Sequence, residues 1–323
     1  MKAEYNNILG MIDEKYIIIA KIDESNFSIV YKVQNVESKV YLAAKVIKPL
    51  HFSRNELNNN RALSKINSPY IIKFISFEQG KIKLSDEEAE DATPFFTFEL
   101  ADKGNLFDYI SCGKGGFKEF HCKFIFYEIL LGFQAIHNED ICHRDIKAEN
   151  ILISSDRYSI KICDLGFSAD STELQTGSCG TRNYKAPEVI MDRNEYDGIK
   201  ADIFSLGVLL FFLGTSKFNF EQAKINNKSR TSYDYVKEKK NDDFWEICKA
   251  NTIGLTEEFK ELYLRMIAYE PKERPSIDEI INGEWMKDIR GLSENQYESL
   301  RKDVIKEFKE REKIILSNKG LRV

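Results

Sequence analysis

The chain has 323 residues, of which 42% are hydrophobic, 12% aromatic and 31% charged. This length predicts one two-lobed unit or two domains of ordinary size, with enough apolar residues to fill substantial cores. The formal net charge of -5 argues against a nucleic-acid-binding protein, which would normally carry a basic balance or a basic stripe.

The cysteines and the N-terminus bear on the compartment. The six cysteines are scattered, without a Cys-x-x-Cys pair or a zinc-like spacing to the four histidines, which fits a reducing compartment. The N-terminus lacks the layout of a secretory signal. The longest apolar runs, such as residues 17–20 and 208–213, are far shorter than the about 18 residues of a membrane span. We therefore expect a cytoplasmic protein without a membrane span, with the nucleus as the alternative location.

Short strand-like runs dominate the first hundred residues. One helix is predicted at residues 53–66, where Leu57, Leu63 and Ile66 form an apolar stripe before Pro69 ends it. The strands are predicted at residues 16–20, 29–33, 41–47, 71–77 and 94–100.

After Gly104 the pattern becomes helical. Long helical patterns cover residues 117–137 and 200–212, and helices dominate from residue 257 to residue 285. A β-rich part followed by a helical part predicts an α+β fold with two lobes, joined near residues 99–103. The small N-terminal lobe would be β-rich with one main helix, and the larger C-terminal lobe would be mainly α-helical.

A tail follows the helical lobe. Four apolar side chains recur in it at helical spacing among many Lys and Glu residues, namely Tyr297, Leu300, Val304 and Phe308. Two interpretations stay open. The tail is either a helix docked on the large lobe of its own chain, or a regulatory helix that contacts a partner.

Two segments of the second lobe carry the residue types of a phosphoryl-transfer site. Residues 143–150 read His-Arg-Asp-Ile-Lys-Ala-Glu-Asn, and the run Asp164-Leu165-Gly166 follows fourteen residues after Asn150. Such a site needs an Asp to accept a hydroxyl proton, a nearby cation and oxygen ligands for metal ions. The pattern therefore indicates phosphoryl transfer.

These segments resemble the eukaryotic protein kinase family, and the resemblance continues downstream. Residues 180–188 (Gly-Thr-Arg-Asn-Tyr-Lys-Ala-Pro-Glu), 202–207 (Asp-Ile-Phe-Ser-Leu-Gly) and 271–275 (Pro-Lys-Glu-Arg-Pro) follow in the family's order. The Asp-x-Lys at residues 145–147 resembles serine/threonine kinases more than tyrosine kinases. Gly-Phe-Ser after Asp-Leu, and Cys-Gly-Thr before Ala-Pro-Glu, look most like the calcium/calmodulin-dependent group.

The resemblance also implies boundaries along the chain. We expect an N-terminal extension at residues 1–15, a kinase domain at residues 16–289 and a helical tail at residues 290–323. Within the domain, the small lobe would cover residues 16–100 and the large lobe residues 104–289.

For the large lobe, the resemblance implies the catalytic residues. Asp145 would be the base that receives the hydroxyl proton, and Lys147 would neutralise the transferred phosphate. Asn150 and Asp164 would hold Mg²⁺, with Mn²⁺ as the alternative metal, because oxygen ligands suit a hard cation.

Further residues of the large lobe have structural roles in the family. Thr181 is expected to hydrogen-bond close to the two catalytic residues, and Asp202 to anchor the backbone of the catalytic loop. Glu188 would form a buried ion pair with Arg274, in which the loss of one partner leaves an uncompensated charge.

One residue of the catalytic loop bears on regulation. If Thr176 or Ser178 were phosphorylated, Arg144 would be the natural cation to bind the phosphate. These two residues flank Gly177, which occupies the family's usual phosphorylation position. The alternative interpretation is that Thr176 and Ser178 are ordinary loop residues.

The nucleotide side of the resemblance draws on both lobes. Lys45, on the third predicted strand, would hold the α and β phosphates of ATP. Around the adenine ring and at the hinge, the residues implied are Ile22, Val30, Ala43, Phe98, Glu99, Ala101 and Leu152. The apolar members of this set would be buried whether or not ATP binds.

The glycine-rich loop of the family is missing its glycines here. It should lie at residues 22–31, where the three glycine positions are Asp23, Ser25 and Ser28. Glycine permits a positive φ and a close approach of backbone N–H groups to phosphate. We therefore expect the hairpin to survive and its hold on phosphate to weaken.

The partner of Lys45 is a second departure. Counting ten residues back from Pro69 gives Asn59 where the family has a Glu. Asn59 can hydrogen-bond an ammonium but brings no charge. Glu56, three residues earlier on the same helical face, is the alternative partner.

The resemblance implies a serine/threonine kinase that transfers the γ-phosphoryl of ATP to a hydroxyl of a protein substrate. The alternative is a pseudokinase, a scaffold or allosteric binding module with weak or no phosphotransfer. The missing glycines and Asn59 favour the alternative. An enzyme is favoured by the retained residues, which are Lys45, Asp145, Lys147, Asn150 and Asp164.

Overall fold

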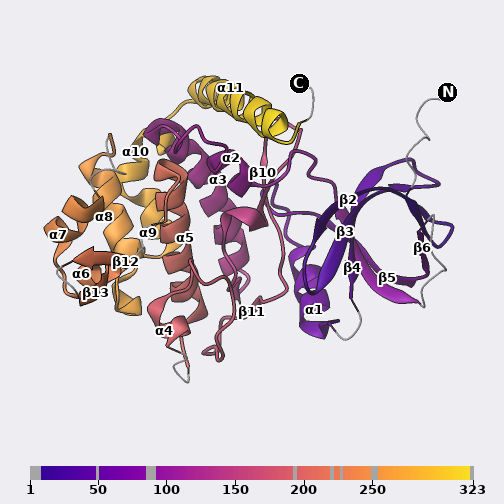
Figure 1. The fold of residues 1–323 in the computed structure, drawn as a ribbon, viewed down its shortest axis with the longest axis horizontal. Helices are drawn as coiled ribbons and strands as arrows, with labels where there is room; N and C mark the ends of the chain where they lie inside the picture. Colours follow the sequence, from indigo (N-terminus) through magenta and orange to yellow (C-terminus); the bar gives the residue numbers. More distant parts are fainter. Residues whose placement is uncertain are drawn as a thin grey trace. The chain divides into compact units, whose positions relative to one another are not determined.

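The computed structural model describes residues 9–48, 51–84, 92–191, 195–218, 222–225, 228–248 and 254–320. The chain divides into two units, Met1–Asp102 and Lys103–Val323. A large sheet with one described helix makes up the first unit, and helices dominate the second (Figure 1). This arrangement confirms the predicted α+β class, with a small β-rich lobe and a larger helical one.

The sheet of the first unit has seven strands in the order β5-β7-β4-β3-β2-β1-β6, and neighbouring strands are antiparallel. Successive side chains point to opposite faces, so one face of β3 and β4 buries Val33 and Ala44 completely and forms the core of this unit. The strands are β1 (Gly10–Ile12), β2 (Tyr16–Glu24), β3 (Ser28–Asn35), β4 (Tyr41–Ile47), β5 (Phe74–Gly80), β6 (Ile82–Leu84) and β7 (Thr93–Glu99).

All five predicted strands are present, although β5 begins at Phe74 instead of residue 71. Strands β1 and β6 were not predicted, because three residues are too few to show an alternation. Strand β1 pairs with both β2 and β6. Part of the segment 1–15, which the sequence assigned to an N-terminal extension, is therefore paired into the sheet.

Helix α1 (Arg54–Leu63) begins at a capping residue and buries a polar face. The Ser53 hydroxyl accepts a hydrogen bond from the Glu56 N–H at 3.4 Å. Glu56 and Asn60 are four residues apart, which places them on the same side of the helix, and both are buried. The helix ends at Leu63, before the predicted end at residue 66.

Two long helices form the centre of the second unit, α3 (Glu119–His137) and α5 (Gly198–Thr215). Ile129 and Phe133 of α3 and Leu206 of α5 are fully buried, as expected for helices that are apolar on most sides. The shorter helices are α2 (Leu106–Ile110), α4 (Pro187–Ile190), α6 (Tyr233–Lys237), α7 (Asn241–Cys248), α8 (Glu257–Met266), α9 (Ile277–Asn282) and α10 (Lys287–Arg290). Three two-stranded ladders pair β8 (Ile141–Cys142) with β11 (Ala169–Asp170), β9 (Ile151–Ile153) with β10 (Ile160–Ile162), and β12 (Gln222–Ile225) with β13 (Lys228–Thr231).

Helix α5 is the only helix among the described residues whose length and mean hydropathy, 1.6, would suit a membrane span. Its environment explains this composition, because 78% of the helix is buried inside the protein. The apolar side chains of α5 are therefore already covered by other parts of the second unit.

Helix α11 (Glu294–Asn318) packs along α2 and α3 at the edge of the second unit (Figure 1). Leu300, Val304 and Phe308 are buried, in agreement with their helical spacing in the sequence. The tail is thus a helix docked on its own unit, the first of the two interpretations that the sequence left open.

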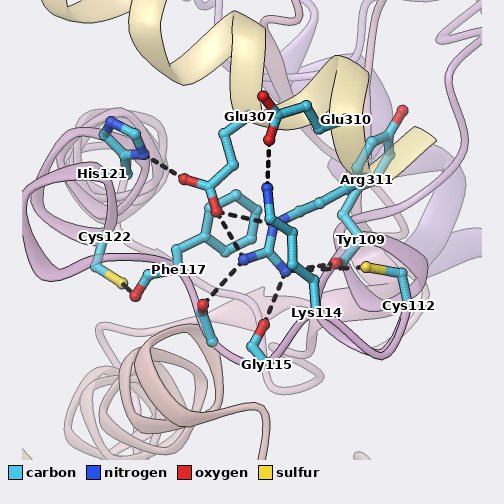
Figure 2. Close-up of polar contacts among 11 residues, drawn as sticks. Tyr109, Cys112, Lys114, Gly115, Phe117, His121, Cys122, Glu307, Glu310 and Arg311 are labelled. Atoms are coloured by element: carbon cyan, nitrogen blue, oxygen red, sulfur yellow. Dashed lines mark hydrogen bonds and ion pairs between the residues drawn. The ribbon is translucent and has the colours of Figure 1, made fainter. Parts of the chain in front are cut away.

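A buried arginine fixes α11 to the loop that follows α2 (Figure 2). Arg311 is 1% exposed, and its guanidinium donates to the carbonyls of Tyr109, Gly115 and Gly116 at 3.1, 2.8 and 2.9 Å. The same group lies 3.8 Å from the centre of the Phe117 ring. Such a cation–π contact gains strength when water is excluded.

The charge of Arg311 is balanced within the helix. Glu307 accepts from Arg311 Nη2 at 2.7 Å and is also in contact with His121 Nδ1 of α3. Burial disfavours the ionised carboxylate, but the bonds from His121 and Arg311 outweigh it and hold the pKa of Glu307 at about 2. Glu307 therefore stays charged at neutral pH and compensates Arg311.

Replacing Arg311 with Met should destabilise the protein strongly. The variant removes the cation that pairs with the buried Glu307 carboxylate and the donor of the Tyr109, Gly115 and Gly116 carbonyls. Breaking a buried pair typically costs about 3–5 kcal/mol. Unfolding by urea, followed by circular dichroism, measures the loss. Lys309→Met, on the exposed side of the same helix, is the matched control and should change stability by less than about 0.5 kcal/mol. Equal effects of the two changes would contradict this role of Arg311.

Candidate active site

Asp202 of α5 holds the backbone of the segment that carries the predicted catalytic residues. Its carboxylate accepts from the N–H groups of His143 (2.7 Å) and Arg144 (2.9 Å), and His137 Nε2 lies 3.0 Å from it. Arg144 has a φ of +64°, a conformation that a residue with a side chain keeps only when its surroundings enforce it. The two bonds to the buried Asp202 carboxylate supply that enforcement.

The carboxylate of Asp145 is fixed by contacts to both of its oxygens. Thr181 Oγ1 donates to Oδ1 at 2.7 Å, and Lys147 Nζ donates to Oδ2 at 2.7 Å. Asn150 Nδ2 donates to the Asp145 carbonyl at 2.8 Å and to Oδ2 at 3.2 Å. Asp145 is 4% exposed, so this basic group is oriented by the protein, with the ammonium of Lys147 to balance its charge.

A close approach of two loops brings Thr181 beside Asp145. Gly180 has a φ of +91°, and a Cβ at this position would lie 2.4 Å from the carbonyl oxygen of Arg144. A residue with a side chain would therefore push the loops apart. With glycine in place, Thr181 Oγ1 also accepts from Lys147 Nζ at 3.1 Å.

Asn150 and Asp164 flank the same end of one hairpin. Ile151 of β9 lies opposite Ile162 of β10, and the Cys163 N–H donates to the Asn150 carbonyl at 3.0 Å. The residue before β9 and the residues after β10 are therefore neighbours. The bonds of the Asn150 side chain to Asp145 use its nitrogen, which directs the amide oxygen away from Asp145.

The Glu149 carboxylate has one oxygen atom that is left without a partner in the part of the chain that the structure describes. Its Oε2 atom is buried and has no hydrogen-bond partner among the described residues. Burial raises the pKa of the Glu149 carboxyl above its usual range, although the nearby Lys147 opposes this effect. Such a group would be stabilised by a cationic ligand.

The pair Glu188–Arg274 is buried and bidentate. Arg274 Nη1 and Nη2 donate to the two Glu188 oxygens at 2.6 and 2.8 Å, and Arg274 Nε donates to the Ala268 carbonyl at 2.9 Å. The centre of the Phe204 ring lies 5.1 Å from the guanidinium. The pair joins α4 to the segment before α9 and lies outside the group around Asp145.

In the first unit, Lys45 of β4 pairs with Glu56 of α1. The two atoms Lys45 Nζ and Glu56 Oε1 are 2.6 Å apart, and Glu56 is 7% exposed. Of the two positions that the sequence left open, the ion pair is therefore made at Glu56, whereas the count from Pro69 had pointed to Asn59. A count from Pro69 does not fix how many of the intervening residues are helical, and α1 ends at Leu63, before the predicted end at residue 66.

Four of the residues that the resemblance assigned to ATP share one face of the sheet. Val30 lies opposite Lys45, and Ala43 lies opposite Phe98. Opposed residues share a face, as do residues two apart on one strand. The set therefore lies on the face that is opposite the core residue Ala44.

The remaining residues of that set lie at three other places. Ile22 sits at an irregularity in the pairing of β2 with β3 and is 48% exposed. Glu99 ends β7, and its carboxylate accepts from the Lys73 N–H at 2.9 Å. Ala101 follows it in the first unit, and Leu152 lies on β9 of the second unit.

Arg144, which the sequence suggested as the partner of a phosphate on Thr176 or Ser178, makes a different hydrogen bond in the structure. Arg144 Nε donates to the Phe167 carbonyl at 2.7 Å. Ser178 Oγ instead accepts from Lys185 Nζ at 3.2 Å, and Gly177 has a φ of +77°. Ser178 is therefore already in contact with a cation, the ammonium of Lys185.

Three residues that order the site had no role in the sequence analysis. The His143 ring accepts from the Asp145 N–H at 3.2 Å, and His137 contacts Asp202. Tyr184 OH accepts from the Ala148 N–H at 3.2 Å. His143 and Tyr184 lie inside the quoted motifs, so their place in those motifs could have indicated a role. His137 lies in no motif, and nothing in the sequence indicated its role.

Comparison with known proteins agrees with this geometry. Residues 16–286 match the family model described as "Protein kinase domain". Serine/threonine-protein kinase SAPK6 from Oryza sativa subsp. japonica is 31% identical over 87% of this chain and 74% of its own length. Serine/threonine-protein kinase SAPK4 of the same subspecies is 30% identical over 84% and 72%. SNF-related serine/threonine-protein kinase from Homo sapiens is 27% identical over 87% of this chain, which spans 34% of the human protein. The chain therefore belongs to the protein kinase family.

Proposed function

We propose that the chain is a serine/threonine protein kinase that transfers the γ-phosphoryl of ATP to hydroxyl groups of a protein substrate. The observation that carries the proposal is the Asp145 carboxylate, held between Lys147, Thr181 and Asn150. A scaffold has no use for a buried base whose two oxygens are oriented in this way. The names of the relatives support the same activity.

The roles of the residues follow from their chemistry. Asp145 accepts the proton of the substrate hydroxyl as that oxygen attacks phosphorus. Lys147, 2.7 Å from Asp145, neutralises charge on the transferred phosphoryl group. Thr181 fixes the positions of both side chains relative to each other, since it donates to Asp145 and accepts from Lys147. Positioning and electrostatic stabilisation account for most of the rate in phosphoryl transfer.

The donor set near Asp145 fits Mg²⁺, with Mn²⁺ as the alternative. Asn150 and Asp164 offer an amide and a carboxylate oxygen, the ligands preferred by hard divalent cations. The hydrogen bonds made by the nitrogen of Asn150 leave its oxygen directed away from Asp145, which supports this role. When bound, the cation would balance charge on the phosphates.

For the nucleotide, we propose that Lys45 contacts the phosphates and is positioned by Glu56. Val30, Ala43 and Phe98 give the sheet an apolar face on which an adenine ring can lie. The same role is proposed for Ile22 and Leu152, and a hinge role for the backbone at Glu99 and Ala101.

The tail and the compartment are further parts of the proposal. Helix α11 is buried along one side and fixed by Arg311, which supports a permanent structural role over a regulatory contact with a partner. All six cysteines are free, in keeping with a reducing compartment such as the cytoplasm or the nucleus.

Glu56→Gln should lower kcat/KM for the phosphorylation of a basic generic substrate by about tenfold or more, because Lys45 loses the charge that positions it. Steady-state assays with ATP and Mg²⁺ measure the change. Asn59→Gln, at the position to which the sequence count pointed, is the matched variant and should change the rate by about twofold at most. A larger loss in the Asn59 variant would contradict the pairing.

Asp145→Asn should remove phosphotransfer, since general-base catalysis contributes about 10²–10⁴-fold and Asn cannot accept the proton. Transfer of labelled phosphate from ATP to the protein itself or to a basic substrate is the measurement. Asp156→Asn, in an exposed turn of the same unit, should keep full activity. If wild type and Asp145→Asn give the same background, the pseudokinase alternative is correct.

The Oε2 atom of Glu149, which has no partner among the described residues, should favour substrates with an Arg on the N-terminal side of the acceptor. Glu149→Gln should reduce the preference for an Arg-containing peptide over its Ala counterpart by about tenfold, the worth of one hydrogen bond between charged groups. The ratio of kcat/KM for the two peptides is the readout. Glu139→Gln, at an exposed site, should leave the ratio unchanged, and an unchanged ratio in Glu149→Gln would disprove the preference.

A further inference from the structure

In the turn between β2 and β3, a side chain of the turn accepts hydrogen bonds from the turn's own backbone N–H groups. Ser25 Oγ accepts from the N–H of Phe27 at 3.1 Å and from the N–H of Ser28 at 3.1 Å. The Ser25 N–H donates to the Ser28 carbonyl at 2.9 Å. One hydroxyl oxygen therefore occupies two consecutive donors at the tip of the hairpin.

These two N–H donors lie where a kinase would bind phosphate. Consecutive backbone N–H groups in a turn form a concavity that binds anions, and the loop at this place in a protein kinase covers the phosphates of ATP. Ser25 and Ser28 stand at two of the positions where the resemblance expected glycine. Here the Ser25 hydroxyl oxygen already accepts the two N–H hydrogen bonds that a phosphate oxygen would otherwise accept.

We propose that Ser25 is an internal competitor for the phosphates of ATP. This inference rests on the proposed function. By holding the N–H groups of Phe27 and Ser28, the Ser25 hydroxyl lowers the contribution of the phosphates to nucleotide affinity. The adenine-facing side chains and Lys45 then supply most of the binding, and ATP, ADP and adenosine bind with similar affinities.

The rest of the turn keeps this arrangement in place. Lys48 Nζ donates to the Ser25 carbonyl at 2.7 Å, and the Lys48 N–H donates to the Phe27 carbonyl at 2.9 Å. Ser28 is 6% exposed. Residues 23–28 are all described, and none of them has a positive φ. The turn is therefore built for residues with side chains and makes no use of the freedom of glycine.

The charged side chains at the tip of the hairpin also weaken the binding of phosphate. Lys48 and Lys21 both pair with the Glu24 carboxylate, at 2.8 and 3.0 Å. Their hydrogen bonds hold the pKa of Glu24 at about 2, so this carboxylate is ionised throughout the physiological range. Both ammonium groups are thus directed to a protein anion. Asp23, next to Glu24 in the sequence, adds a second negative charge.

The test compares nucleotides that differ only in their phosphates. Isothermal titration calorimetry on the full chain with Mg²⁺ gives affinities for adenosine, ADP and ATP, for wild type and for Ser25→Ala. Removal of the hydroxyl should raise the ratio of ATP affinity to adenosine affinity by about tenfold, the worth of one charge-assisted hydrogen bond. The adenosine affinity should stay constant.

Two further variants separate the competitor role from a general effect on the sheet. Ser25→Thr keeps the hydroxyl and should retain the wild-type ratio. Ser38→Ala is the matched control, because it removes a hydroxyl that accepts from the Val40 N–H at 3.4 Å in the next hairpin turn. It should leave all three affinities unchanged.

Each outcome decides the matter. An unchanged or lower ratio in Ser25→Ala, with adenosine still bound, overturns the competitor role and leaves the kinase proposal standing. Tighter ATP binding in Ser25→Ala alone supports it, including the case in which wild type binds no ATP. If neither protein binds any of the three nucleotides, the competitor role and the nucleotide site proposed above both fail.

Discussion

The carboxylate of Asp202 is the contact on which the geometry of the site depends. It is 1% exposed and receives hydrogen bonds from two consecutive backbone N–H groups of another segment. Those two groups belong to a backbone that turns through a positive φ at Arg144 and so cannot form a regular ladder there. Because Asp202 is part of α5, the position of Asp145 is tied to the most buried helix of the second unit. The packing of α5 in the core therefore keeps the residues of the site in place.

Three arginines of the second unit each face a buried carboxylate. Arg274 faces Glu188, Arg311 faces Glu307, and Arg301 donates to Glu128 at 2.6 Å. A buried pair adds little net stability compared with apolar packing, but the loss of one partner is costly. Such pairs therefore act mainly to exclude other arrangements of the segments they join. Glu188–Arg274 and Glu128–Arg301 join parts of the chain that lie far apart. Glu307 and Arg311 belong to one helix, and Arg311 ties that helix to the loop after α2.

The sequence predicted most of the fold and the segments that meet around Asp145, for reasons that differ between elements. Strands β3 and β4 could be predicted because their alternation extends over several residues, and residues 143–150 because their chemistry is specific to one kind of reaction. Strands β1 and β6 are too short to carry a pattern. The partner of Lys45 depends on where α1 begins and ends, which counting from Pro69 cannot determine. The contact of Ser25 with two N–H groups depends on turn geometry, which residue identity alone does not specify. The resemblance to the calcium/calmodulin-dependent group stays a prediction.

The anchoring of α11 has a consequence for where this protein can be divided. The match to the protein kinase domain stops at residue 286, yet the donors that satisfy the carbonyls of Gly115 and Gly116 come from Arg311, in the helix beyond that boundary. The same helix holds Lys103, the first residue of the second unit, through Glu312 at 2.9 Å. The segment that folds as one cooperative piece is therefore longer than the segment that homology recognises. A fragment cut at the end of the homologous region would lose the covering of its own α2 loop. Expression and crystallisation work on this protein should keep the chain through Asn318.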